Sequence, residues 1–218
     1  MITGRIGPPG FSDIGKQPIP RDSIMKISRI SRNFILTFLF LGLTGCSQQH
    51  FVTIDPALPV NQSDLGQNKI LNLKVIDSRP NNVISKWKGK FNFRRFRVSP
   101  EQDIADVLYA KIVTGLQKTG FTLKRLPSQK IKTLRVEILQ LKSIYDEDGP
   151  NLGVRVSAIL RAHCNNKDRT YRKLYMEHLT RNPITPTSFP NEKLVNDSLS
   201  GALKKMFSDD QLLKCLAQ

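Results

Sequence analysis

The sequence is poor in the residue types that usually carry catalysis and metal binding. Its 218 residues include three cysteines, three histidines and one tryptophan. It also lacks the Gly-x-Ser-x-Gly, His-Glu-x-x-His and phosphate-binding glycine-loop patterns of common enzyme classes. His163 and Cys164 are adjacent, but neighbouring residues of a strand point to opposite faces and do not easily share a proton. We therefore expect a protein that is not an enzyme and that holds no metal or cofactor.

Acidic residues are scarce relative to basic ones. Lysine and arginine together number 34, against 18 aspartates and glutamates, which gives a formal charge of +16. Such an excess attracts anionic partners, for example phosphates or acidic lipid headgroups.

Long apolar runs are scarce as well. The neutral stretch 33–45 is shorter than the roughly 20 apolar residues that cross a bilayer. It follows Lys26, Arg29 and Arg32, with no acidic residue between Met25 and Cys46. A short apolar run behind a basic start is typical of a signal peptide, here residues 25–45.

The end of this run, Leu43-Thr44-Gly45-Cys46, resembles the lipobox of bacterial lipoproteins. Small residues before the cysteine let the backbone enter the signal peptidase, and the thiol takes up a diacylglyceryl group. We therefore predict cleavage between Gly45 and Cys46, with acyl chains on Cys46 holding the protein on a membrane. Ser47 resembles the signal for sorting to the outer membrane, which implies a domain in the periplasm. The alternative is a short core helix that ends in a buried cysteine.

Four parts of the chain are expected. Residues 1–24 show no apolar periodicity and are expected to be a gene-model extension or a disordered leader. The signal peptide 25–45 is followed by a lipidated tether over 46–67, where apolar residues are sparse. Residues 68–218 are expected to form a single domain, because a chain of this length has room for one ordinary core.

Apolar alternation and helical spacing predict the elements of this domain. Strands are predicted over residues 69–76, 121–125, 133–145, 152–163 and 169–179, and helices over 191–207 and 209–216. A further helix is predicted to begin at Ser99, because Ser99-Pro100-Glu101-Gln102 matches a capping box, and to end at a left-handed Gly120. The order β-α-β-β-β-α packs most simply as an α+β two-layer sandwich, a mainly antiparallel sheet with two helices on one face.

Taken together, the lipobox, the early strand ending in Asp77-x-Arg79, the helix start at Ser99 and the terminal helix resemble the YajG family of envelope lipoproteins. The resemblance spans most of residues 46–218. It implies an outer-membrane-attached lipoprotein domain and assigns no catalytic residue. The chain departs from the family pattern in a basic segment, residues 86–97, and in the two cysteines of the mature domain.

The basic segment contains six cations, four aromatic residues and no acid. In an extended strand, cations and aromatic residues would lie on opposite sides. One interpretation is a patch that binds anionic lipid, lipopolysaccharide or peptidoglycan. The other is an irregular hairpin whose aromatic residues close the core. Nucleic acid is not expected as a partner, because a secreted domain at a membrane rarely meets it. The candidate patch residues are Lys86, Trp87, Lys88, Lys90, Arg94, Arg95 and Arg97.

Cys164 and Cys215 are the two cysteines that remain once Cys46 carries lipid. The compartment outside the inner membrane is oxidising and favours a bridge between them. A bridge requires the C-terminal segment to fold back until the two Cα atoms lie within about 7 Å. Otherwise the cysteines are expected to be unpaired, one at a strand end and one on an apolar terminal turn.

Two functions remain open from the sequence. One is a non-enzymatic envelope scaffold or accessory lipoprotein, and the other is a carrier that binds lipid or lipopolysaccharide. A ligand groove between helices and sheet would favour the carrier, whereas a filled core with buried aromatic residues would favour the scaffold. The sequence identifies no protein partner.

We predict that Cys46→Ser abolishes lipidation and processing, because a serine hydroxyl is a poor replacement for the thiol in thioether formation. Metabolic labelling with a fatty-acid probe measures this directly. Undiminished label in the variant would contradict the lipoprotein assignment.

Overall fold

Alternation of apolar and polar side chains builds the longest strands of the protein. In β7 (Gly153–Asn166), every second side chain from Val154 to Cys164 is buried. The computed structural model describes residues 47–88, 95–124, 132–146, 153–166, 169–181 and 190–218, which all belong to one unit, residues 46–218.

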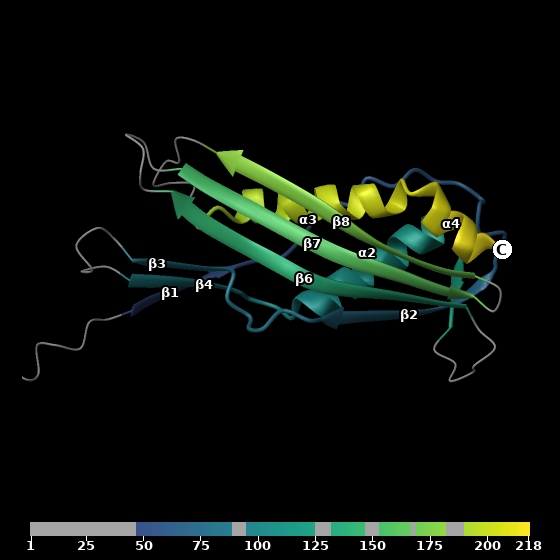
Figure 1. Ribbon diagram of the computed structural model, residues 1–218, viewed down its shortest axis with the longest axis horizontal. Coiled ribbons are helices and arrows are strands. Elements are labelled where there is room, and N and C mark those ends of the chain that lie inside the picture. The colour runs from purple at the N-terminus through teal and green to yellow at the C-terminus, as the bar shows by residue number, and fades with distance from the viewer. Residues whose placement is uncertain (1–46, 89–94, 125–131, 147–152, 167–168, 182–189) are drawn as a thin grey trace, which may run out of the picture. The chain divides into compact units, whose positions relative to one another are not determined.

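A five-stranded sheet forms around β7 in the order β5-β2-β6-β7-β8 (Figure 1). β6 (Lys132–Asp146) and β8 (Arg169–Arg181) flank β7 and are antiparallel to it. β2 (Ile70–Asp77) runs parallel to both β6 and β5 (Thr122–Leu123). Because β2 ends opposite Ile138, the part of β6 beyond a β-bulge at Ile138/Gln140 has no β2 neighbour.

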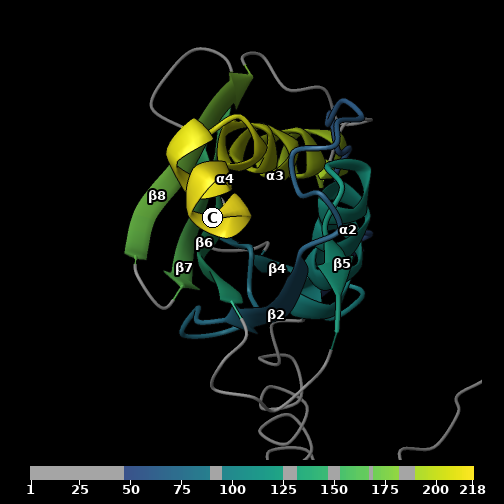
Figure 2. The ribbon, with the colours of Figure 1, turned by 90° about the vertical axis from the view of Figure 1, so that its right-hand side faces the viewer.

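Three helices cover one face of this sheet (Figure 1, Figure 2). α2 (Ile104–Lys118) packs on β2 and β5, whereas α3 (Glu192–Phe207) and α4 (Asp210–Ala217) pack on β7 and β8. The apolar sides of the helices and the inner face of the sheet form one core. The expected α+β class, with helices on one face of a sheet, is therefore confirmed, and α4 is a third helix on that face.

A second sheet of three strands lies at one end of the domain, in the order β1-β4-β3 (Figure 1). β1 (Ser47–Val52) is parallel to β4 (Arg95–Pro100), and β3 (Ser85–Lys88) is antiparallel to it. The expectation of a tether over 46–67 is therefore wrong for its first part. Apolar residues are few there, but Val52 and Ile54 are buried in the core, and β4 supplies a backbone partner from a distant part of the sequence.

Helix α2 begins later than the capping-box pattern predicts. Ser99 and Pro100 are the last residues of β4, so the strand pairing with β1 occupies the predicted helix start. The N-cap is Asp103, whose carboxylate accepts hydrogen bonds from the backbone N–H groups of Ala105 and Asp106. The prediction of a helix was correct, and its predicted cap was wrong.

Two residues of the predicted capping box instead fix the chain after β1. The carboxylate of Glu101 accepts a hydrogen bond of 2.9 Å from the Thr53 hydroxyl. The side-chain oxygen of Gln102 accepts one of 3.0 Å from the backbone N–H of Ile54. Both bonds join segments that are remote in sequence, which a local pattern does not reveal.

The other end of α2 agrees with the sequence. Gly120 has a φ of +83°, and the N–H groups of Gly120 and Phe121 close the helix on the carbonyls of Gln117 and Leu116. This is the hydrogen-bond pattern of a Schellman cap, in which glycine avoids the steric cost of a left-handed residue.

The ring of Phe207, the last residue of α3, packs against α2 at a glycine. A methyl group at Gly115 would collide with the ring of Phe207. We predict that Gly115→Ala destabilises the domain by about 1–2 kcal/mol, because overpacking outweighs the gain in helix propensity. Urea unfolding followed by circular dichroism measures the change.

The control variant is Gly201→Ala in α3. There the added methyl meets the side chain of Glu177, which is partly exposed and can turn outward at the small cost of its surface ion pair with Lys205. This variant should be neutral or more stable by up to about 1 kcal/mol, as expected for glycine to alanine within a helix. Equal destabilisation of the two variants would contradict the packing argument.

Candidate functional site

The first described residues of the chain and the described ends of the basic segment belong to one small sheet. β1 begins at Ser47, the residue after Cys46, and the register partner of Ser47 is Arg95. Arg95 in turn lies opposite Lys88, the last residue of β3. The β1-β4-β3 sheet therefore places Ser47, the first described residue, next to β4, with β3 on the far side of β4 (Figure 1).

Several predicted residues lie outside the described part of the chain. These are the signal peptide 25–45 with its cleavage site at Gly45 and Cys46, and Lys90 and Arg94 of the basic segment. For Lys88 and Arg95 the structure describes the backbone alone. The description of the patch therefore rests on Lys86, Trp87 and Arg97.

Two of the patch cations face each other across the strands. Lys86 pairs in register with Arg97, and both side chains are exposed. Like charges directly opposite one another in a sheet repel. An anion bound next to such a pair would reduce this repulsion.

The aromatic residues lie on the other side of these two strands and pack together. Trp87 pairs in register with Phe96, and their ring centroids are 5.0 Å apart. Phe96 also makes edge contacts with Tyr145 at 5.4 Å and with His50 at 5.9 Å. Nε1 of Trp87 is buried and has no hydrogen-bond partner among the described residues. For these described residues, the aromatic side chains serve packing and the cations face solvent.

Cys164 and Cys215 are joined in a disulfide. Cys164 ends the buried side of β7, Cys215 lies in α4, and their Cα atoms are 6.4 Å apart. The bridge spans 51 residues of sequence, for which chain entropy predicts a stabilisation of about 4 kcal/mol. It ties the C-terminal helix to the sheet at the end of the domain that lies away from β1 (Figure 1).

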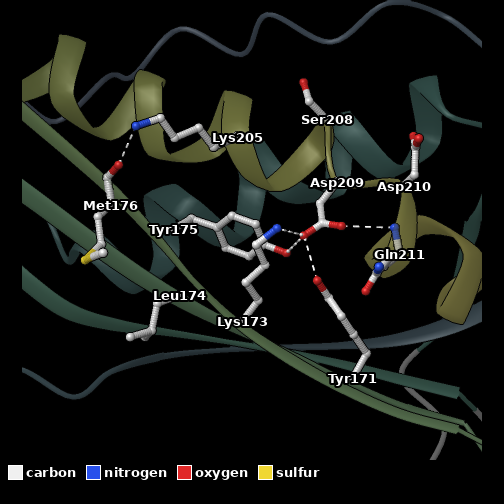
Figure 3. A pocket seen from close by; sticks show the side chains of 10 residues that line it. All are labelled: Tyr171, Lys173, Leu174, Tyr175, Met176, Lys205, Ser208, Asp209, Asp210 and Gln211. Carbon is white, nitrogen blue, oxygen red and sulfur yellow. Dashed lines mark hydrogen bonds and ion pairs between the residues drawn. The ribbon is translucent and has the colours of Figure 1, made fainter.

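A polar cluster that the sequence did not predict surrounds Asp209, in a surface pocket of about 620 Å³ (Figure 3). The Asp209 carboxylate accepts hydrogen bonds of 2.9 Å from both the Tyr171 and Tyr175 hydroxyls. Nζ of Lys173 lies 2.8 Å away from the same carboxylate. Three side chains of β8 therefore converge on one residue of the α3–α4 turn.

The same carboxylate also caps α4. It accepts hydrogen bonds from the backbone N–H groups of Gln211 at 3.0 Å and Leu212 at 3.3 Å. Burial by itself would raise the pKa of Asp209, but the hydrogen bonds from the three β8 side chains outweigh it and lower the pKa to about 2. With five donors, the carboxylate is saturated and has little capacity left for a ligand. The cluster is thus a structural link between β8 and α4.

Asp209→Asn removes the charge of the carboxylate but keeps the capping of α4, because asparagine is also a good N-cap. The folded-state pKa of about 2 is lower than the ordinary 3.8, so the charged form stabilises the fold above about pH 4 and this contribution is lost as the pH falls toward 2. We expect the variant to be less stable than the wild type by about 1–3 kcal/mol at pH 7 and by much less near pH 2. Urea unfolding at the two pH values measures this, and an equal difference at both would contradict it.

No helix in the described part of the chain is both long and apolar enough to cross a membrane. Among solved structures, the chain is similar to a minor lipoprotein from Acinetobacter baumannii, with 10% identity and a TM-score of 0.40 over 65% of this chain and 91% of the other. It is also similar to a putative neuraminyllactose-binding hemagglutinin homolog from Helicobacter pylori, with 10% identity and a TM-score of 0.43 over 76% of this chain and 97% of the other. No curated protein matches the chain.

A family model described as an uncharacterized lipoprotein matches residues 56–217. The match covers most of the chain, including the five-stranded sheet and all three helices. It begins after β1 and therefore does not include the lipobox from which lipidation was predicted. Family membership implies association with a membrane through acyl chains. The chain belongs to this family of uncharacterized bacterial lipoproteins.

Proposed function

We propose that this protein is a YajG-type, non-enzymatic lipoprotein of the outer membrane that acts as an envelope scaffold or accessory factor, with its β1-β4-β3 sheet turned toward the membrane. The observation that carries the proposal is that β1 begins at Ser47, directly after Cys46. Acyl chains on Cys46 would therefore hold the sheet at the level of the headgroups, without a free linker. The lack of common catalytic motifs in the sequence supports the non-enzymatic part.

The charges at this end of the domain support contact with an anionic surface. Lys86 and Arg97 are exposed and face each other, so phosphate groups between them would relieve their repulsion. Basic residues near an acidic membrane surface contribute about 1 kcal/mol each to binding. Acidic lipid and lipopolysaccharide both provide such phosphates.

The packing of the helices favours the scaffold over the lipid carrier. A carrier needs space for an acyl chain between the helices and the sheet. At this interface Leu199, Leu203 and Met206 of α3 are no more than 1% exposed. Phe207 fills the space beside Gly115 so closely that a methyl group would not fit. This part of the interface is therefore filled. The pocket beside it, between β8 and the α3–α4 turn, is open to the surface and holds the charged Asp209 cluster, which does not suit an acyl chain.

The test is vesicle sedimentation of the unit 46–218 carrying Cys46→Ser, which removes the acyl anchor. The double variant Lys86→Gln/Arg97→Gln should bind vesicles containing phosphatidylglycerol about 30-fold more weakly, since two cations contribute about 1 kcal/mol each. Binding should also fall as salt is raised, because the contact is electrostatic.

The matched control removes two cations from helices elsewhere on the domain, as Lys118→Gln/Lys214→Gln. Both lysines are exposed and lie in the last turns of α2 and α4. This variant has the same net charge as the first and should retain most of the binding. Equal losses in the two variants, or equal binding to neutral and acidic vesicles, would reject an oriented basic patch.

A further inference from the structure

A pocket of about 520 Å³ lies where the two sheets meet. Its walls come from the connection between β2 and β3, from the start of β3, and from β6 beyond the β-bulge. β3 is held against β6 by a 2.8 Å hydrogen bond from the Ser143 N–H to the Ile84 carbonyl and by one of 2.8 Å from the Ser85 hydroxyl to the Ser143 carbonyl. The departure of β2 from the edge of β6 leaves room for the pocket.

One wall of this pocket contains a buried arginine with an unused donor. The side chain of Arg79 is 4% exposed. Its Nε lies 2.9 Å and its Nη2 2.7 Å from oxygens of Asp77, in a two-pronged ion pair. Nη1 is also buried, but no atom of the described residues accepts a hydrogen bond from it. A buried donor without a partner costs free energy and is rare in native proteins. We therefore expect a ligand atom to accept a hydrogen bond from this nitrogen.

Two lysines add positive charge at the pocket. Lys86 of β3 and Lys142 of β6 both line it, and both are exposed. No acidic residue is found among the described residues that line the pocket. With Asp77 offsetting one of the three cations, the local charge is close to +2. A phosphate monoester carries roughly the opposite charge near neutral pH.

We propose that this pocket binds a phosphate group, with Arg79 as the buried donor and Lys86 and Lys142 as mobile cations at its mouth. Asp77 fixes the guanidinium, so that its third nitrogen is held ready for an oxygen of the ligand. Contact with Nη1, which is shielded from water, requires a small shift of the pocket wall. The phosphate belongs either to a free phosphorylated molecule or to the headgroup of a lipid.

The single tryptophan of the chain provides a probe, because Trp87 directly follows Lys86 in β3. Inorganic phosphate is titrated into the Cys46→Ser unit 46–218, and binding is followed by Trp87 fluorescence and by calorimetry. We expect a saturable signal in the wild type. The signal should be lost in Arg79→Lys, which keeps the charge but not the fork of donors. It should weaken about tenfold or more in Lys142→Gln, which removes one charge-assisted contact.

Lys142→Gln keeps the test decisive if Arg79→Lys fails to fold, since Lys142 is exposed and makes no ion pair among the described residues. The control Lys118→Gln/Lys214→Gln should leave phosphate binding unchanged. Absence of a saturable signal in the folded wild type, or equal affinity in Lys142→Gln, would overturn the proposal.

Vesicles then distinguish the two sources of the phosphate. Vesicles of phosphatidic acid should compete with inorganic phosphate if the pocket takes a lipid headgroup, whereas no competition would assign it to a free phosphorylated molecule. The pocket does not depend on the proposed membrane orientation. Phosphate binding that is weakened in Lys142→Gln while vesicle binding is retained would separate the pocket from the basic patch.

Discussion

Every second side chain of β7 between Val154 and Cys164 is removed from water, and this buried strip requires cover from other elements. Helices α3 and α4 supply most of that cover, and α2 continues it over β2. Burial of apolar surface, at about 25 cal/mol per Å², is the main term that holds these layers together. The disulfide and the Asp209 cluster only secure the C-terminal end of the same cover, by tying α4 to β7 and β8.

The small β1-β4-β3 sheet connects the predicted membrane anchor to this core. Val52 and Ile54 lie in the core just after β1, and the backbone of Ile84 links β4 on one side to β6 on the other. Residues 47–54 are therefore tied to the folded domain within a few residues of the predicted acylation site. A lipoprotein with a long free linker samples many orientations, whereas acyl chains on Cys46 would restrict this domain to a narrow range. A restricted orientation would keep the basic surface turned toward the membrane.

Asp209 and Arg79 are both buried charged residues, and they differ in how completely they are satisfied. Five donors surround the Asp209 carboxylate, so its charge is fully used within the protein. Arg79 has two nitrogens on Asp77 and a third that has no partner in the described part of the chain. A saturated group stabilises the fold it belongs to, while an unsatisfied one retains the capacity to bind something else. This contrast is why the pocket at Arg79, and not the larger one at Asp209, carries the ligand proposal.

The sequence by itself determined the features that depend on local pattern. Alternation predicted the strands from Lys132 to Arg181, helical spacing predicted α2, α3 and α4, and Gly120 marked the end of α2, because each signal lies within a few neighbouring residues. The lipobox is local in the same sense. The tertiary structure alone decided the role of residues 47–54, the true cap at Asp103 and the convergence on Asp209 and at the Arg79 pocket. The first, third and fourth depend on contacts between segments far apart in the chain. The cap at Asp103 depends on how far the pairing of β4 with β1 extends. Only the packing of the whole domain brings these segments together.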